Sequence, residues 1–150
     1  MSEHRAELSW KRTSSDFSYD TYNREHVCTF PGGATLPMSA TPEFKGDASC
    51  ANPEEALVAA LSSCHMLSFL AIASKKQLCV EEYRDHACGY LEKNSAGQMA
   101  VTKVVLRPIV EFSKDTPVDR SQIEQIHHKA HQVCFIANSV KTEVLVEPIF

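Results

Sequence analysis

The sequence predicts an α+β fold, because two helical segments of different character are set among groups of strand-like segments. Residues 56–73 carry no formal charge and form the first predicted helix. The segment that opens at Pro117 and has Asn138 as its left-handed terminator places apolar side chains on one helical face and forms the second. Strands that precede, separate and follow the helices favour α+β over a repeated βαβ array. A chain of 150 residues, 43% of them apolar, fits one compact domain over residues 1–150.

The N-terminal third predicts short strands followed by a long loop. Apolar and polar side chains alternate, as in half-buried strands, over residues 6–10, 17–19 and 26–30. Pro31-Gly32-Gly33 then predicts a turn. Residues 36–52 have no apolar period and are predicted as a loop, and a loop of this length is often functional.

The first helix has clear signals at both ends. Asn52 can cap it, Pro53 suits its first position, and Glu54-Glu55 suits the positive end of its dipole. Lys75-Lys76 places cations at the negative end. The uncharged stretch is close in length to a membrane span. However, Ser62-Ser63-Cys64-His65 stands in its middle, where lipid would penalise polar side chains. We therefore expect a buried central helix wrapped by sheet, and no membrane association.

The second half predicts a hairpin, the second helix and a last strand. Residues 80–91 and 99–112 read as two strands joined by a polar turn that contains glycine, as in an antiparallel hairpin. Pro117-Val118-Asp119-Arg120 opens the second helix. The apolar face of that helix consists of Ile123, Ile126, Ala130, Val133 and Cys134. Residues 142–146 form the last strand.

Composition narrows the class of function. The formal net charge is −4 and no run of Lys or Arg is present, so we expect no nucleic-acid partner. Residues 1–7 are polar and lack the apolar core of a signal peptide, so we expect a cytoplasmic protein with reduced thiols. The six cysteines include no CxxC pair. Cys28, Cys79 and Cys88 fall in predicted strands and are assigned to the core.

Two short motifs carry the chemistry. Asn52-Pro53-Glu54-Glu55 is followed, ten residues after Glu54, by Cys64-His65-Met66. Much later, Cys134 precedes Phe135-Ile136-Ala137-Asn138-Ser139. These motifs resemble those of the OsmC/Ohr family, the osmotically inducible and organic hydroperoxide resistance proteins. The resemblance implies an OsmC-like fold, in which an antiparallel sheet wraps a long buried central helix and a second helix in an intertwined homodimer. It also implies a thiol peroxidase that reduces organic hydroperoxides to alcohols without metal or haem.

The resemblance assigns roles to individual residues. Cys64 matches the cysteine that attacks the peroxide and becomes a sulfenic acid, and Cys134 matches the one that resolves it as a disulfide. Glu54 matches the acidic residue at the head of the central helix. Arg24 is the candidate for the arginine beside the reactive sulfur; in one branch of the family this arginine lies just before the NPEE motif, where the chain offers only Lys45. An external dithiol, either a small molecule or a lipoylated or thioredoxin-like protein, would reduce the disulfide.

The chemistry of a thiol nucleophile requires these residue types, apart from any resemblance to a family. The nucleophile is the thiolate, and a thiol of ordinary pKa is mostly protonated at neutral pH, so an apolar site needs a nearby cation. Arg24 would stay charged, and Glu54 could balance it or could interact with the helix dipole alone. Glu54 lies about 15 Å from Cys64 along one straight helix. Two antiparallel copies would bring Glu54 of one subunit near Cys64 of the other, so we expect an obligate homodimer with a composite site.

Two alternatives from other classes remain open. His127, His131 and Cys134 fall at i, i+4 and i+7 on one helix face, and Cys64 could complete a zinc site of two cysteines and two histidines. A non-catalytic redox sensor would form the Cys64–Cys134 disulfide without rapid turnover. His65 adjoins Cys64 but points about a quarter-turn away, so it is assigned a structural or surface role.

Overall fold

The computed structural model describes residues 1–150, and the chain forms two compact units, Met1–Ala56 and Leu57–Phe150. Each unit is described on its own. Helix α1 (Pro53–Lys75) begins in the first unit and continues in the second. Two α-helices with mostly antiparallel strands confirm the predicted α+β class. One domain over residues 1–150 stays a prediction.

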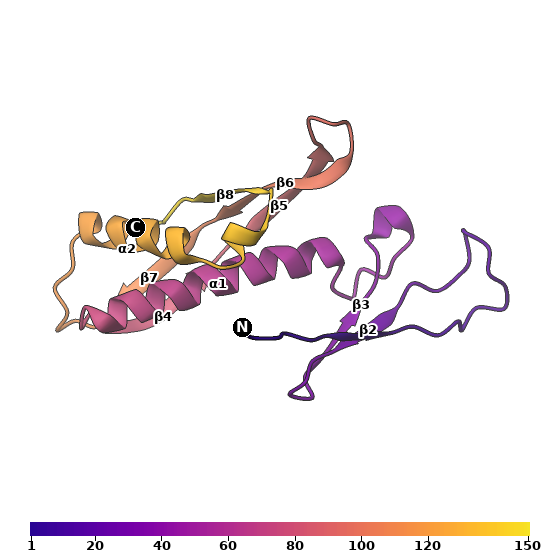
Figure 1. Cartoon of the computed structure of the whole chain (residues 1–150), viewed down its shortest axis with the longest axis horizontal. Coiled ribbons are helices and arrows are strands. Elements are labelled where there is room, and N and C mark those ends of the chain that lie inside the picture. The colour runs from indigo at the N-terminus through magenta and orange to yellow at the C-terminus, as the bar shows by residue number, and fades with distance from the viewer. The chain divides into compact units, whose positions relative to one another are not determined.

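The Met1–Ala56 unit is built on a three-stranded antiparallel sheet. In order across the sheet, its strands are β1 (Glu7–Ser9), β2 (His26–Thr29) and β3 (Thr35–Met38) (Figure 1). The predicted turn follows β2, and Gly33 has the left-handed φ of 83° that favours glycine. The loop after β3 contains one turn of 3-10 helix, η1 (Pro42–Phe44).

The strand predicted over residues 17–19 is wrong, because these residues lie in a loop. The Phe17 ring packs between Trp10, at 5.9 Å between ring centroids, and Tyr22, at 5.2 Å. The backbone N–H groups of Thr21 and Tyr22 both donate to the Ser18 carbonyl and close the loop. The alternation that suggests a strand therefore reflects a local aromatic cluster.

Helix α1 is closed by local hydrogen bonds at both ends, and Asn52 caps its start as predicted. Asn52 Oδ1 accepts from the Glu55 N–H at 2.8 Å, and Glu55 Oε2 accepts from the Asn52 N–H at 3.0 Å. Beyond the last turn, Gln77 takes a left-handed φ of 58°. The Leu78 N–H then donates to the Ala73 carbonyl at 3.0 Å.

The Leu57–Phe150 unit combines the rest of α1 with a long hairpin and helix α2 (Arg120–Val133). The hairpin strands are β4 (Val80–Asp85), β5 (Cys88–Lys93), β6 (Met99–Leu106) and β7 (Pro108–Phe112). β5 pairs with β6 and β4 with β7, both antiparallel, which confirms the predicted hairpin. Each arm is broken at its middle, where Asp85 Oδ1 accepts from the Arg107 N–H at 2.7 Å. The last strand, β8 (Glu143–Val146), joins β6 in parallel.

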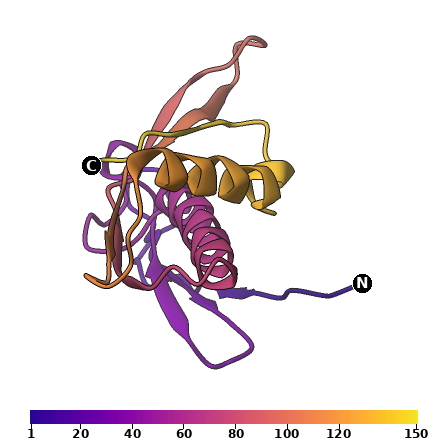
Figure 2. The same cartoon turned by 90° about the vertical axis from the view of Figure 1, so that its left-hand side faces the viewer.

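The core of this unit has two apolar clusters along one stripe of α1. Phe69 packs with Ile126 and Ala130 of α2, which lies beside α1 in both views (Figures 1 and 2). Eight residues before Phe69, Leu61 packs with residues of β6 and with the segment that follows α2. His65 stands between Leu61 and Phe69 and is equally buried.

The remaining faces of α1 are far less buried within the chain. Its buried positions are Leu61, His65, Phe69 and Ala73. By length and composition alone α1 could span a membrane, a property that the core helix of a soluble protein shares. The predicted burial of the central helix therefore holds for one stripe within a single chain.

Candidate functional site

Cys64 and Cys134 come together although 70 positions separate them in the sequence. Cys64 is half-buried on α1. Cys134 is buried, and it is the first residue after α2, where its N–H donates to the His131 carbonyl at 3.3 Å. The N–H of Ala137 donates to Cys134 Sγ at 3.4 Å. One thiol thus lies on α1, and the other lies in the chain turn directly after α2.

The two thiols have different electrostatic surroundings. Burial raises the pKa of Cys134 to about 11, and its hydrogen bond with Cys64 acts in the same direction. Cys134 therefore stays protonated at neutral pH and presents an S–H donor to the Cys64 sulfur. The backbone N–H groups of Ala137 and Ile136 act in the opposite direction on the pKa of Cys134, but burial outweighs them.

A pair of buried histidines lies beside the thiols. His65 Nε2 and His127 Nδ1 are 3.0 Å apart, and the two rings are parallel within 4°. Burial lowers the pKa of His65 to about 4 and that of His127 to about 3, so both rings are neutral. The surface alternative for His65 is wrong; the structural one holds. The spacing of His65 from Leu61 and Phe69, four residues each way, is the sequence signal that places it on the buried stripe.

The same pair bears on the zinc alternative. His127 uses Nδ1 to bind His65, which leaves only its Nε2 for a metal. No group of three or more His, Cys, Asp or Glu side chains is placed to hold a metal ion. The set of Cys64, His127, His131 and Cys134 therefore does not assemble as a coordination site.

Arg24 is buried in the Met1–Ala56 unit and held by main-chain acceptors. Its Nη atoms donate to the carbonyls of Tyr22 at 2.8 Å and Tyr19 at 2.7 Å, and its guanidinium lies 3.9 Å from the centroid of the Tyr22 ring. It lines a pocket of about 410 Å³ together with Trp10 and Phe17. Arg24 is thus a fixed cation in an aromatic setting.

The expected ion pair between Arg24 and Glu54 is not formed within the chain. Glu54 is half-buried and makes no hydrogen bond or ion pair, because Glu55 makes the reciprocal cap with Asn52. Lys45, the alternative cation, pairs with Asp20 at 2.8 Å. The structure brings the two cysteines together and leaves the Glu54 carboxylate free.

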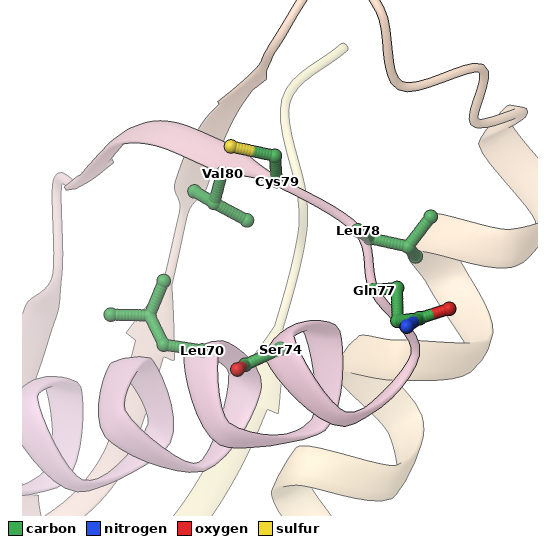
Figure 3. Close-up of a pocket in the computed structure, with 6 residues that line it drawn as sticks. All are labelled: Leu70, Ser74, Gln77, Leu78, Cys79 and Val80. Carbon is green, nitrogen blue, oxygen red and sulfur yellow. The ribbon is translucent and has the colours of Figure 1, made fainter.

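Of the other cysteines assigned to the core, only Cys28 is buried. Cys79 and Cys88 are exposed, so that assignment is wrong for them. Cys79 lies just before β4, where its thiol faces Glu81 at 3.8 Å. It lines a pocket of about 450 Å³ opposite Leu70 and Ser74 of α1 (Figure 3). The error arises because strand membership does not say which face of a sheet a single chain covers.

An α+β fold with two neighbouring thiols, one on the long helix and one after the second helix, defines a class of cysteine-pair redox proteins. The family model for OsmC-like proteins matches residues 46–148, and the chain belongs to that family.

Several relatives have related sequences or structures. An OsmC-like protein of unknown function from Vibrio cholerae is 51% identical, with a TM-score of 0.95 over 99% of this chain and 100% of that one. The organic hydroperoxide resistance protein OsmC from Legionella pneumophila is 17% identical and shares the fold, with a TM-score of 0.70 over 99% and 96% of the two chains. The uncharacterized protein YmaD of Bacillus subtilis is 24% identical over 81% of this chain and 82% of its own length.

Proposed function

We propose that this protein is a cysteine-based peroxidase that reduces organic hydroperoxides to alcohols. The observation that carries the proposal is the contact between Cys64 and a Cys134 thiol that stays protonated. Two thiols in contact can supply both a nucleophile, whose thiolate attacks a peroxide, and a second sulfur that closes a disulfide with it. Membership of a family that includes organic hydroperoxide resistance proteins supports the same chemistry.

The catalytic cycle has three balanced steps. The Cys64 thiolate attacks the outer oxygen of the hydroperoxide, the O–O bond breaks, and a proton is taken up as the alcohol leaves, which gives a Cys64 sulfenic acid. The Cys134 sulfur then attacks the Cys64 sulfur and water leaves, which gives the disulfide. An external dithiol, small or carried by a lipoylated or thioredoxin-like protein, restores both thiols and is itself oxidised to a disulfide.

Arg24 and Glu54 are proposed to complete the site from a second subunit or from the same one. Arg24 is fixed and charged, which suits a group that stabilises negative charge on sulfur and peroxide oxygen. Glu54 has a free carboxylate that can balance such a cation. Lys45 fits less well, because Asp20 already neutralises it.

A homodimer is part of the proposal. The exposed face of α1 opposite its buried stripe consists of Ala59, Ser63, Leu67 and Ala71, which we call the outer face. Small and apolar side chains on a helix face allow a second helix to pack closely. A partner copy there would bury α1 on both sides and supports a composite site.

Single-turnover kinetics test the assignment of roles. Cys64→Ser removes the nucleophile, so consumption of an alkyl hydroperoxide should fall to background. Cys134→Ser removes only the resolving thiol, so one turnover should survive and leave a sulfenic acid that a dimedone-type reagent traps. Excess peroxide should drive that species to the sulfinic acid.

Other outcomes of the same experiment would contradict the proposal. Wild-type consumption by Cys64→Ser would remove Cys64 from the chemistry. Formation of the disulfide without turnover in the presence of a dithiol would instead identify the protein as a redox sensor. If both variants lose stability alike and show no difference in chemistry, the two cysteines have only a packing role in the core.

A further inference from the structure

The His65–His127 hydrogen bond is the buried polar link between α1 and α2. Both side chains are almost inaccessible, at 1% and 2% of full exposure. The two ring planes are parallel within 4° with centroids 5.3 Å apart, and the Phe69 ring centroid lies 4.3 Å from that of His127. A hydrogen bond between two buried rings restricts how they can be oriented, because the donor nitrogen of one ring must face the acceptor nitrogen of the other.

The pair lies where the apolar core is interrupted. Phe69 belongs to one apolar cluster and Leu61 to the other, and His65 stands between them on the same stripe of α1. Apolar contacts are non-directional and tolerate small shifts of one helix over another. The hydrogen bond is the element of this contact that sets how α2 lies on α1.

The position of α2 on α1 determines how close the two thiols lie to each other. His65 is the neighbour of Cys64 on α1, and His127 stands seven residues, about two turns, before Cys134 on the same face of α2. A displacement of α2 relative to His65 would move the end of α2 and Cys134 with it. The hydrogen bond that joins the histidines and the contact that joins the cysteines are therefore coupled through the same two helices.

The neighbours of the pair leave it neutral. His131, Asp85 and Tyr83 are the titratable groups that face it, and burial outweighs the attraction that Asp85 offers to a charged His65. With both rings neutral, one ring donates and the other accepts.

We propose that His65 and His127 are positioning residues for the Cys64–Cys134 disulfide, holding α2 so that the Cys134 sulfur meets the Cys64 sulfur. The pair takes no part in the attack on peroxide. Its part in turnover rests on the proposed peroxidase function, but its effect on disulfide formation does not. It accelerates the step in which sulfenic acid and thiol become disulfide and water, and it favours the disulfide at equilibrium.

A set of variants separates positioning from packing. The double variant His65→Leu/His127→Phe replaces both polar groups with apolar side chains and leaves no unpaired partner, so it should fold. His127→Asn keeps polar atoms near the Nδ1 position and should behave as wild type. His127→Gln places them further out and should behave as the double variant. His128→Phe is the matched control, since His128 is exposed on α2 and contacts only Gln132 by its ring nitrogen.

The first measurement is the equilibrium between the Cys64–Cys134 dithiol and oxidised dithiothreitol, with the remaining cysteines, Cys28, Cys50, Cys79 and Cys88, replaced by serine or alanine. Oxidised dithiothreitol accepts the two electrons and becomes the dithiol, so no peroxide is involved. The equilibrium constant should fall about tenfold in the double variant and in His127→Gln, because the Cys134 sulfur would no longer be held in line with the Cys64 sulfur. It should be unchanged in His127→Asn and His128→Phe. An unchanged constant in both the double variant and His127→Gln would overturn the inference.

The second measurement follows peroxide turnover in the same variants. Sulfenic acid should form at the wild-type rate, the disulfide should form about tenfold more slowly, and sulfinic acid should accumulate at high peroxide. If sulfenic acid formation and disulfide formation fall together, the pair is a general structural element and the inference is wrong. If the equilibrium constants shift as expected while wild type consumes no peroxide, the inference stands and the proposed function falls.

Discussion

At the scale of single residues, the two thiols are distinguished by burial and by one hydrogen bond. The sequence motifs identify Cys64 and Cys134. The residues next to Cys134 in the sequence do not indicate that its thiol is the more buried of the two. The raised pKa of Cys134 follows from burial and from its hydrogen bond with Cys64, which together outweigh the N–H groups of Ala137 and Ile136. Burial of this kind depends on tertiary packing, so a linear motif cannot reveal it.

The histidine pair predicts a specific response to acid. In the unfolded chain both histidines titrate near pH 6.5, whereas in the folded chain they resist protonation to about pH 4 and about pH 3. The unfolded state therefore binds more protons below pH 6.5, and the free energy of unfolding should fall as pH falls from 6.5 toward 4. The slope should approach about 1.4 kcal/mol per pH unit for each histidine. Urea unfolding at pH 7.5, 6 and 5, with reductant present, measures it.

The double variant His65→Leu/His127→Phe is the comparison for that slope. It lacks both histidines with a lowered pKa, so its free energy of unfolding should depend less on pH in the same interval. Its free energy of unfolding near pH 7.5 should change little. His128→Asn, at an exposed position, should keep the wild-type slope. An identical slope in the double variant would mean that other groups cause the loss of stability in acid.

At the scale of elements, the predictions succeeded where the signals are local. The start of α1 was predictable because Asn52 and Glu55 form hydrogen bonds with each other across three residues. The breaks in the hairpin were not predictable. They depend on Asp85, which accepts from the distant Arg107 N–H and from the Ser62 hydroxyl of α1. The parallel placement of β8 likewise results from tertiary contacts.

The contact between α1 and β5 gives a prediction about packing. A Cβ atom added to Gly89 would lie 2.5 Å from Val58 Cγ2, too close without movement of the helix or of that side chain. Gly89→Ala should therefore lower the free energy of unfolding by about 1–3 kcal/mol. In a Val58→Ala background the same change should cost less than half as much, because the clashing methyl is gone. Urea unfolding of the four proteins measures the coupling.

Gly32→Ala is the control for the effect of the substitution itself. No atom lies within 4 Å of a Cβ added at Gly32, so the change should stay within about 0.5 kcal/mol. Equal costs of Gly89→Ala with and without Val58 would show that β5 and α1 do not meet at this point.

At the scale of the whole molecule, the sequence predicted the pair of cysteines better than the surroundings of Arg24 and Glu54. The motifs pointed to both cysteines, and the structure brings them into contact. Arg24 and Glu54 were chosen to balance each other, yet Arg24 binds main-chain carbonyls and Glu54 has no partner in the chain. Residues that act across subunits leave no trace in the contacts of one chain, so their roles need an experiment on the assembly.

Leu67→Glu on the outer face of α1 is that experiment. Leu67 keeps 60% of its full exposure within one chain, and its neighbours on that face are Ala59, Ser63 and Ala71. A charge at the centre of an apolar helix contact would be buried without a partner, so the dimer should dissociate. If Glu54 or Arg24 of one subunit completes the site of the other, peroxide consumption should fall at least tenfold with the dimer, as expected for loss of charge stabilisation. Leu67→Met, which conserves the volume of the side chain, should keep both the dimer and peroxide consumption. Light scattering and stopped-flow assays on the same samples decide the matter: a stable, fully active Leu67→Glu monomer would refute the composite site.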